Sequence, residues 1–382
     1  MTLSVGVNLL WLVPGVVGGS EGYATGLLDR LVDRDDVSMT AFALPGFVRK
    51  YPSLAESTHA VVAPLPEGRH VVRRVLVENA WLASQLGKRE IGLVHHLGGI
   101  VPPRCKVPAV VTLHDLQYLA FPEYFSNAKR RYLHLTQGPS LQRARAVLAI
   151  SEFTREHAID AFGLDANNVH VIPPVIRPLP AVTADRRATI LRDLGIRGDF
   201  ILYPAAFYPH KNHAVLLRAF ADVVKSHDVT LVLTGAVGAG AWGSAHSTQR
   251  DIAEDAVRLG IERRLRMPGY VTNDQLAALY GGASMLAFPS RFEGFGLPVV
   301  EAMSAGCAVI AADATALPAV VGDAGLLIDP DDDVGWGQAM AGLLADPKTR
   351  RKLADAGLDR ARELAAFDPT DRLVEIYASA AG

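Results

Sequence analysis

The sequence predicts an α/β protein with two doubly wound parallel sheets, one in each half of the chain. Short runs of Val, Ile and Leu alternate with longer segments of helical periodicity along most of the 382 residues. Continuous apolar runs of this length are typical of strands that are buried on both faces of a parallel sheet. Between the two series lies a proline-rich stretch that favours extended backbone and predicts a linker. Its prolines are Pro173, Pro174, Pro178 and Pro180.

The first half of the chain contains seven apolar runs that we interpret as strands. Segments with apolar residues at helical spacing separate several of them, as expected for strand–helix–strand units. The predicted strands are residues 5–12, 37–44, 59–65, 91–95, 109–113, 146–150 and 169–172. The predicted helices are residues 23–32, 71–86, 128–143 and 152–162.

The second half repeats this alternation with six predicted strands. Thr272 followed by Gln275 forms a capping box, which predicts the start of a helix before residues 276–280. The predicted strands are residues 200–203, 230–234, 265–268, 284–288, 308–311 and 325–328. Three further predicted helices close the chain at residues 335–344, 350–364 and 370–378.

These series divide the chain into two domains and a returning helix. We expect a first domain over residues 1–175, a second over residues 176–366, and a last helix over residues 367–382 that crosses back to the first domain. In doubly wound sheets, ligands bind beyond the carboxyl ends of the strands. Two such sheets facing each other would place a ligand in the cleft between them.

Composition excludes several classes of protein. The 38 Lys and Arg residues nearly balance the 40 Asp and Glu residues, which argues against a nucleic-acid partner. The only cysteines, Cys105 and Cys307, cannot build a disulfide framework or a zinc site. The apolar start of the chain lacks a basic segment and a cleavage pattern, so we interpret it as a buried strand rather than a signal peptide. These features predict a cytoplasmic protein without a membrane-spanning helix.

The segment over residues 289–302 carries the most chemical information. It follows a buried strand and opens a helix, and its sequence is PSRFEGFGLPVVEA. A helix N-terminus with adjoining glycines is suited to bind a phosphate, because free backbone N–H groups point at the ligand. Glu293 and Glu301 bracket the turn, and a carboxylate can accept two hydroxyl hydrogen bonds from a diol. A simpler interpretation is a helix whose acidic residues only complement its dipole.

This pattern resembles glycosyltransferase family 4, whose members are retaining enzymes of the GT-B fold. The spacing of Glu293 and Glu301 around Gly-Phe-Gly-Leu-Pro is similar to the family signature, and other motifs follow in the family's order. The resemblance therefore covers nearly the whole chain. The other matching segments are Val111–Leu116, Ser151–Thr154, Tyr203–Asn212 and Pro268–Val271.

The resemblance implies a role for each matching residue. Glu301 would hold the ribose hydroxyls, Glu293 the hydroxyls of the transferred sugar, and Lys211 the diphosphate leaving group. His114 would lie beside the donor sugar, although it could also be a polar residue at a strand end. The other implied donor contacts are Gly294, Phe295, Gly296 and Leu297 through the backbone, Tyr270 and Val271 at the nucleobase, and Gly18 and Gly19, which could instead admit the acceptor.

The sequence departs from the family pattern at one cationic position. Many members carry an Arg five or six residues before the phosphate-binding Lys, but Ala206 and Ala205 occupy those positions here. We expect His210, Arg291 or both to supply the missing contact. Arg291 could equally be a solvated loop residue.

The sequence and the resemblance together predict a retaining hexosyltransferase that uses a nucleotide-diphosphate sugar. GDP-mannose is the first expectation for the donor, and the acceptor would be a hydroxyl of a glycan, a lipid-linked molecule or a small molecule. No cofactor and no metal are expected. His95-His96 lacks further ligands at matching spacing, and Asp33-Arg-Asp35 and Asp329-Pro-Asp331 are interpreted as solvated turns. Two alternatives stay open: a catalytically silent partner subunit that binds nucleotide sugar, and a sugar-nucleotide epimerase. The acceptor, the linkage and the oligomeric state are not encoded in a readable pattern.

Basic residues in the first half suggest a surface for an anionic membrane. Arg69, His70, Arg73 and Arg74 begin an apolar-rich predicted helix, and residues 129–131 form a second basic group. Such a helix could bind peripherally at the inner face of a membrane. The alternative is an ordinary amphipathic helix that packs on the core with a charged outer face.

Overall fold

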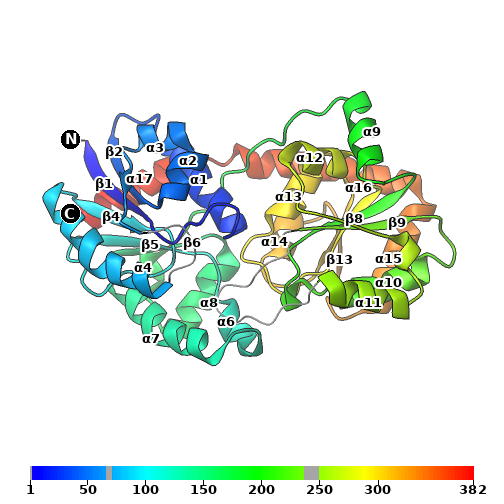
Figure 1. Ribbon diagram of the computed structural model, residues 1–382, viewed down its shortest axis with the longest axis horizontal. Helices are drawn as coiled ribbons and strands as arrows, with labels where there is room; N and C mark the ends of the chain where they lie inside the picture. Colours follow the sequence, from blue (N-terminus) through cyan, green and yellow to red (C-terminus); the bar gives the residue numbers. More distant parts are fainter. Residues whose placement is uncertain (1, 66–70, 236–248) are drawn as a thin grey trace. The chain divides into compact units, whose positions relative to one another are not determined.

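The computed structural model describes residues 2–65, 71–235 and 249–382, and they form two compact α/β units (Figure 1). The first unit contains the chain up to Val175 together with Asp368–Gly382, and the second contains Ile176–Phe367. The chain therefore crosses between the units twice. Each unit has a single parallel sheet covered by helices, so the predicted pair of doubly wound sheets is confirmed.

The first sheet has seven strands in the order β3-β2-β1-β4-β5-β6-β7, and all paired strands run parallel. The strand order reverses between β1 and β4, which makes the carboxyl ends of these two strands the ligand-binding edge. The strands are β1 (Leu3–Leu9), β2 (Val37–Ala43), β3 (Val61–Val62), β4 (Leu93–His96), β5 (Ala109–Leu113), β6 (Ala146–Ala149) and β7 (Val169–Val171).

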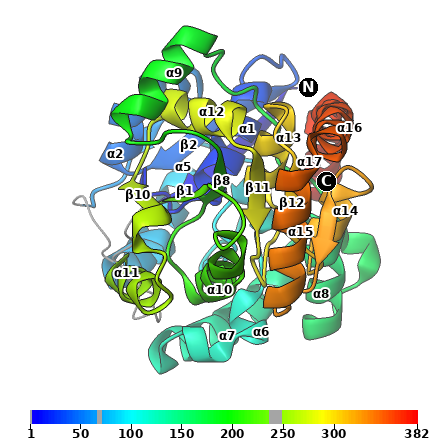
Figure 2. The same cartoon turned by 90° about the vertical axis from the view of Figure 1, so that its right-hand side faces the viewer.

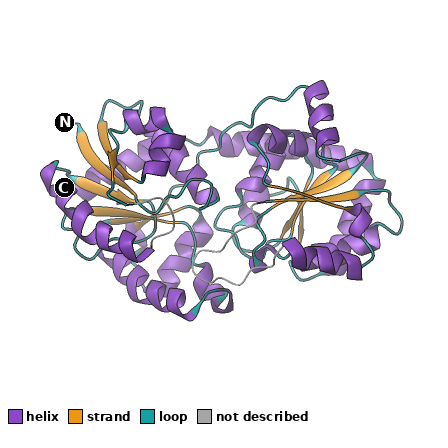
Figure 3. Cartoon of the chain, viewed as in Figure 1, coloured by secondary structure: helices purple, strands orange, loops and turns teal. Residues whose placement is uncertain are grey.

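Helices cover both faces of the first sheet (Figures 1 and 3). The last helix, α17, contacts α1, β4 and β5, which attaches the end of the chain to the first unit. The helices are α1 (Gly19–Leu31), α2 (Pro45–Lys50), α3 (Pro52–Ser57), α4 (Val71–Val77), the π-helical turn η1 (Glu78–Leu82), α5 (Ala83–Lys88), α6 (Gln117–Ala120), η2 (Pro122–Tyr124), α7 (Asn127–Arg143), α8 (Glu152–Phe162), η3 (Ala166–Asn168) and α17 (Thr370–Ala381).

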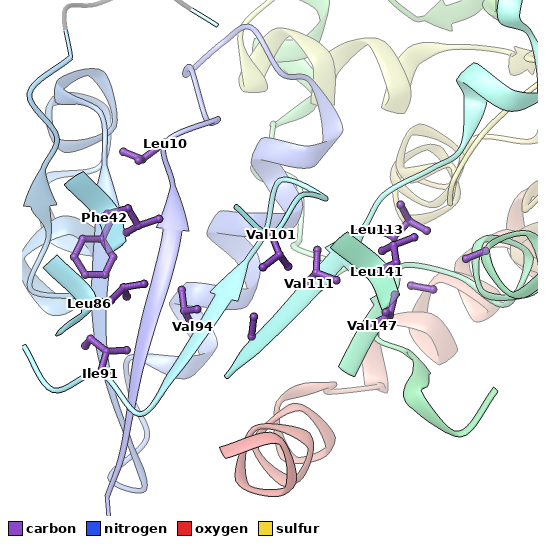
Figure 4. Packing of buried hydrophobic residues seen from close by; sticks show 14 of the residues in the cluster. Leu10, Phe42, Leu86, Ile91, Val94, Val101, Val111, Leu113, Leu141 and Val147 are labelled. Carbon is purple, nitrogen blue, oxygen red and sulfur yellow. The ribbon is translucent and has the colours of Figure 1, made fainter. Parts of the chain in front are cut away.

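A cluster of buried aliphatic and aromatic side chains holds the first unit together (Figure 4). Phe42, Val94 and Val111 come from three strands and are fully buried, while Leu86 and Leu141 reach them from α5 and α7. Burying one such side chain contributes about 1.5–3 kcal/mol. This cluster makes the sheet a rigid support for the loops at its carboxyl edge.

The second sheet has six strands in the order β10-β9-β8-β11-β12-β13 (Figure 2). Its strand order also reverses, here between β8 and β11, and it matches the order of the first sheet without an equivalent of the edge strand β7. The strands are β8 (Phe200–Pro204), β9 (Thr230–Thr234), β10 (Leu265–Gly269), β11 (Met285–Phe288), β12 (Val309–Ala312) and β13 (Leu326–Ile328).

Helices of the second unit lie on both faces of its sheet, with α12 and α16 on one side and α10, α11 and α15 on the other (Figure 1). The predicted capping box of α12 is confirmed, because the Thr272 hydroxyl accepts from the Gln275 N–H and the Gln275 side chain accepts from the Thr272 N–H. The helices are α9 (Ala184–Asp193), η4 (Pro209–Lys211), α10 (His213–Val223), α11 (Gln249–Arg258), η5 (Glu262–Arg264), α12 (Asn273–Gly282), α13 (Leu297–Ser304), α14 (Leu317–Val321), α15 (Asp333–Ala345) and α16 (Pro347–Ala366).

One local prediction was wrong, and two short helices were missed. The strand expected over residues 59–65 shrinks to β3, because His59 has a positive φ and Pro64 lacks a backbone donor. The helix expected over residues 71–86 is confirmed as the continuous run of α4, η1 and α5, within which η1 is a π-helical turn. The short helices α2 and α3, which begin at prolines, were not predicted. Within the described part of the chain, no helix has the length and hydropathy needed to cross a bilayer.

Candidate functional site

The second unit gathers its chemical groups on three loops at the point where the strand order reverses. The loop after β8 carries Lys211, the loop after β11 carries Glu293, and the loop after β12 carries Thr315. Because these strands are neighbours and parallel, their carboxyl ends lie along one edge of the sheet. The sequence signal for this arrangement was the pair of motifs around Lys211 and Glu293.

Lys211 and Glu293 form the central contact of this edge. The Lys211 Nζ lies 2.5 Å from the Glu293 Oε1, and the two side chains are only 16% and 12% exposed. The ammonium also lies 5.6 Å from the centre of the Phe288 ring. The Tyr203 hydroxyl donates to the Lys211 carbonyl at 2.5 Å, which fixes the backbone of the lysine. The ammonium of Lys211 could therefore bind a phosphate at this edge, and the carboxylate of Glu293 could bind the hydroxyls of a polyol.

Asn212 fixes the turn that presents Lys211. It adopts the left-handed conformation, with φ of 58°, which Asn tolerates better than most residues. Its side-chain amide is buried and donates to the Pro330 carbonyl at 2.6 Å. The Lys-Asn pair in the sequence therefore combines a charged group with the residue that orients it.

Thr315 supports Glu293 from the neighbouring loop, and sequence reasoning did not identify it. Its hydroxyl accepts from the Glu293 backbone N–H at 3.0 Å. Its φ is 55°, which is unusual for a β-branched residue and costs on the order of 1–3 kcal/mol. Backbone strain of this kind clusters at functional sites, so Thr315 belongs with the candidate site.

The glycine-rich turn brings Glu301 onto α13. Gly296 caps this helix with φ of 104°, and a Cβ there would lie 2.6 Å from a Leu317 methyl group. Gly294, Phe295 and Leu297 complete the turn, in which Phe295 is buried. Glycine is therefore required at position 296 for both its conformation and its packing.

Glu301 has a partner that the sequence did not reveal. The buried Tyr280 hydroxyl donates to the Glu301 Oε2 at 2.9 Å and orients the carboxylate. Burial raises the pKa of Glu301, and the hydrogen bond from Tyr280 works against that rise. Its Oε1 accepts no hydrogen bond from another described residue.

His210 and Arg291, the expected substitutes for the missing Arg, differ in their charge and in their contacts. Burial, together with Lys211 and His213 nearby, lowers the pKa of His210 well below its ordinary value, so the ring is neutral near pH 7. The Arg291 guanidinium pairs with Asp331. The backbone N–H of Arg291 donates to the His210 carbonyl at 2.8 Å, which joins the loop after β11 to the loop after β8. His210 thus offers hydrogen bonds rather than charge, and Arg291 is largely neutralised.

Tyr270 and Val271 lie elsewhere along the same edge. They follow β10, which is two strands away from β8 in the sheet. The Tyr270 ring is 72% exposed and packs on no core. An exposed ring of this kind is free to stack on a planar ligand.

The first unit places Gly18 and Gly19 at the start of α1. Gly18 has φ of 63° and ψ of −139°, a conformation that only glycine adopts readily. No atom lies within 4 Å of a Cβ built on either glycine, so the space beside this helix start is open.

Glu21 fixes the loop between β1 and α1 through hydrogen bonds. This role was not predicted from the sequence. Glu21 is 7% exposed and accepts from the Gly15 N–H at 2.7 Å, from Lys50 at 2.7 Å and from the Tyr51 hydroxyl at 2.5 Å. These contacts tie the loop after β1 to α2 and α3.

His114 follows β5 at the carboxyl edge of the first sheet. Its Nε2 donates to the Leu97 carbonyl at 2.8 Å, and the rings of Trp11 and Tyr23 flank it at 5.7 and 5.2 Å between centroids. Burial lowers its pKa, so the ring is neutral near pH 7. Because Nε2 carries the proton, Nδ1 is left as a hydrogen-bond acceptor.

The other candidate metal ligands have structural roles. His95 contacts the Tyr377 hydroxyl at 2.6 Å and the Thr112 hydroxyl at 2.7 Å, and His96 accepts from the Asn8 amide at 3.0 Å. Asp329 caps the turn that contains Asp331. Over the residues that the structure describes, no three His, Cys, Asp or Glu side chains gather as a metal site would require.

Family models match both halves of the chain. Residues 17–178 match the model for Glycosyltransferase Family 4, and residues 188–360 match the model for glycosyl transferases group 1. The two matches fall on the two units.

Individual proteins agree with these models. The chain is 30% identical to the O-antigen chain mannosyltransferase B of Escherichia coli over 289 residues, which is 74% of each protein. It is also 30% identical to a D-inositol 3-phosphate glycosyltransferase of Salinispora tropica over 316 residues, or 78% of this chain and 62% of that protein. The crystal structure of HepE from Anabaena, in complex with UDP and glucose, matches 98% of this chain and all of its own with a TM-score of 0.74 and 22% identity.

The two Rossmann-like units and their matches define a glycosyltransferase of the GT-B type. The chain belongs to glycosyltransferase family 4.

Proposed function

We propose that this glycosyltransferase moves a hexose from a nucleotide-diphosphate sugar to an acceptor hydroxyl, with retention of configuration and without a metal. The observation that carries the proposal is the contact of Lys211 with Glu293 beside the glycine-rich start of α13. Lys211 and the N–H groups of the helix start suit a diphosphate, and Glu293 suits the hydroxyls of the sugar. Glu301, held by Tyr280, is suited to the ribose hydroxyls.

The proposed reaction needs stabilisation of a leaving group more than it needs a protein nucleophile. The bond between the anomeric carbon and the diphosphate oxygen breaks, and its electron pair leaves with the diphosphate. The acceptor oxygen forms its bond on the same face, and its proton passes to the departing phosphate oxygen. A fixed ammonium and oriented N–H groups lower the barrier by stabilising the developing negative charge.

His114 would contribute as a hydrogen-bond acceptor in this scheme. Its Nδ1 can accept from a sugar hydroxyl, while its lowered pKa keeps the ring neutral. The same Nδ1 could act as a base, but the proposal assigns the proton to the phosphate. Gly18 and Gly19, with open space beside them, would admit the donor phosphates or the acceptor.

GDP-mannose is the proposed donor. The Escherichia coli relative is a mannosyltransferase, which supports mannose as the sugar. The HepE structure contains UDP and glucose, so a uridine nucleotide is the main competing donor. The proposed acceptor is a glycan, a lipid-linked molecule or a small molecule.

Thermal unfolding with GDP, UDP, dTDP and ADP, each with and without EDTA, tests the proposal. A nucleotide at 100 times its dissociation constant should stabilise the protein by about 2.7 kcal/mol. We expect GDP to give the largest shift and EDTA to leave it unchanged. Glu301→Gln should remove the shift, whereas Glu254→Gln, which alters an exposed carboxylate on α11, should keep it.

Other outcomes of this experiment identify the alternatives. A shift that requires a divalent cation would contradict the metal-independent mechanism. A shift with UDP alone would replace the donor base but leave the reaction class intact. Nucleotide binding without transfer to any acceptor would favour a silent partner subunit, and isomerisation of the donor sugar would favour an epimerase.

We also propose that the first unit binds the inner face of an anionic membrane through an apolar surface on α4 and α7. Val72, Leu76 and Leu135 are 73%, 64% and 66% exposed, although they are large apolar residues. Between the two helices lies a mostly apolar cavity of about 140 Å³ that Val75 and Leu135 line. Exposed apolar side chains beside Arg73 are typical of interfacial helices. Two residues of the basic group, Arg69 and His70, lie outside the described residues.

Flotation with vesicles that contain an anionic lipid tests this membrane surface. Val72→Ser/Leu76→Ser should reduce the bound fraction, because burying both side chains contributes about 3 kcal/mol to binding. Val257→Ser, which alters a valine on α11 that is 64% exposed, is the matched control. Equal flotation of both variants would contradict the proposed surface.

A further inference from the structure

The first unit contains a polar cavity that none of the roles above uses. It has a volume of about 330 Å³ and lies between α17 and the starts of β6 and β7. Since the strands are parallel, these starts are at the opposite edge of the sheet from His114, which follows the end of β5. The cavity is therefore separate from the candidate site of the same unit.

The groups that line this cavity favour an anion with attached hydroxyls. Arg145 makes no hydrogen bond or ion pair through its guanidinium with any described residue. Arg372 contributes a second guanidinium, which pairs with the Glu375 carboxylate at 2.9 Å. Uncharged donors and acceptors complete the wall, and they are Asn167, Asn168 and Ser379.

The pKa of His170 reflects the positive charge around the cavity. His170 stands on β7 and lines the wall with Arg145 and Arg372. Its pKa is lowered by burial and by the positive charges of Arg372 and Arg155. Arg155 itself is held against β7 through a hydrogen bond to the Val169 carbonyl at 2.9 Å. Positive charge thus prevails at this wall, with Glu375 as the one carboxylate among the lining residues.

The volume indicates more than a lone inorganic ion. A water molecule takes up about 30 Å³ of liquid, and small-molecule sites begin near 300 Å³. A phosphate would pair with Arg145 and Arg372, because a guanidinium matches phosphate oxygens with two parallel hydrogen bonds. The remaining space, with Asn168, Ser379 and Glu375 on its walls, suits the hydroxyls of a sugar-sized group.

We propose that this cavity is a second ligand site that binds a phosphorylated carbohydrate of monosaccharide size. The phosphate contacts Arg145 and Arg372, and the hydroxyls contact the amides and Ser379. Because α17 forms one wall, the bound ligand joins this helix to β6 and β7 and stabilises the first unit. The site is independent of the donor and acceptor proposed above.

Calorimetric titration of the full chain with mannose 6-phosphate, inorganic phosphate and mannose tests the site. We expect saturable binding of the sugar phosphate, weaker binding of phosphate and none of mannose. Arg145→Ala should weaken the sugar phosphate about tenfold, since a hydrogen-bonded charge is lost. Glu375→Gln should tighten it about threefold, because it removes the opposing charge and releases Arg372. Arg197→Ala, at an exposed arginine of the second unit, should change nothing.

A second readout separates this site from any phosphate binding in the second unit. The His170 resonance, assigned with a His170→Gln variant, should show a pKa that rises when the sugar phosphate binds, because a bound anion favours the charged ring. Equal affinities for wild type and Arg145→Ala, or a His170 pKa that the ligand leaves unchanged, would overturn the proposal. Absence of saturable binding would overturn it as well. Thermal unfolding of each variant without ligand establishes that it is folded.

Discussion

The contact of Lys211 with Glu293 can serve both the stability of the second unit and the proposed reaction. Each side chain neutralises the other across 2.5 Å, which a largely buried charge requires. In the proposed function, a diphosphate would take the ammonium and a sugar would take the carboxylate. The two side chains would then separate. Until the donor binds, their contact would hold the ammonium and the carboxylate in position.

Substitutions of this pair separate its contribution to stability from its contribution to transfer. Lys211→Met should destabilise the second unit by about 1–3 kcal/mol, because it leaves Glu293 without its cation. It should lower kcat/KM by a factor of about 100–1000, because the leaving group loses a charge partner. The double variant Lys211→Met/Glu293→Gln should recover stability but not activity. Chemical denaturation and donor turnover measure the two effects.

The matched control for this prediction is Lys225→Met, which breaks an exposed pair with Asp222. Such a pair contributes little, so both stability and turnover should stay close to wild type. If Lys211→Met retained full turnover, Lys211 would have no part in the reaction.

At the scale of elements, α17 is attached to the first sheet through specific hydrogen bonds. Its Tyr377 is fully buried and contacts the His95 ring of β4, whose other nitrogen contacts Thr112 of β5. Burial lowers the pKa of His95 to about 3, so the ring stays neutral and uses one nitrogen as donor and the other as acceptor. The helix is thus fixed through a polar network inside the core.

Removal of one hydroxyl tests this attachment. Tyr377→Phe should lower the free energy of unfolding of the first unit by about 1–3 kcal/mol, because a buried ring nitrogen of His95 loses its partner. Amide hydrogen exchange should rise first in α17 and β4. Tyr270→Phe alters an exposed hydroxyl and should have no such effect. Unchanged exchange in α17 would mean that apolar packing alone holds the helix.

Elements with a strong local signal were predictable from the sequence. The helix at residues 152–162 and the strand at residues 109–113 have the predicted bounds, because capping residues and continuous apolar runs mark their ends. The π-helical turn η1 was not predictable, since it inserts a residue into a segment with ordinary helical periodicity. Strand β3 depends on pairing with β2, which no local pattern of residues 59–65 expresses.

The candidate site was predictable to a similar extent. Lys211, Glu293 and Glu301 stand in compact motifs, and their chemistry was readable from those motifs. Their partners come from distant positions: Tyr280 is 21 residues from Glu301, and Thr315 is 22 residues from Glu293. A hydroxyl that orients a carboxylate from another element leaves no periodic or spacing signal. The same reason explains why Glu21 was missed.

At the scale of the whole molecule, both units bury neutral histidines. Burial lowers the pKa of His95 and His96 in the first unit and of His213 in the second to about 3. The ordinary value of 6.5 applies in the unfolded chain, so only the unfolded state gains these protons as the pH falls below about 6.5. Stability contributed by the neutral rings is therefore present above that pH and is lost toward pH 3.

His213→Phe tests this acid sensitivity in the second unit. The ring packs against Tyr203 and Phe207, and neither nitrogen has a hydrogen-bond partner among the described residues. The variant should be more stable than wild type, and its advantage should grow by up to about 1.4 kcal/mol per pH unit below pH 6.5. Thermal unfolding from pH 7 to pH 5 measures the difference. A constant difference over this range would contradict a neutral His213.

The return of α17 to the first unit also determines when that unit can be completed during synthesis. A ribosome makes His95 long before Tyr377, and the whole second unit emerges between them. The second unit can therefore close while the first still lacks a helix against β4 and β5. Until α17 has left the exit tunnel, its place against β4 and β5 stays uncovered.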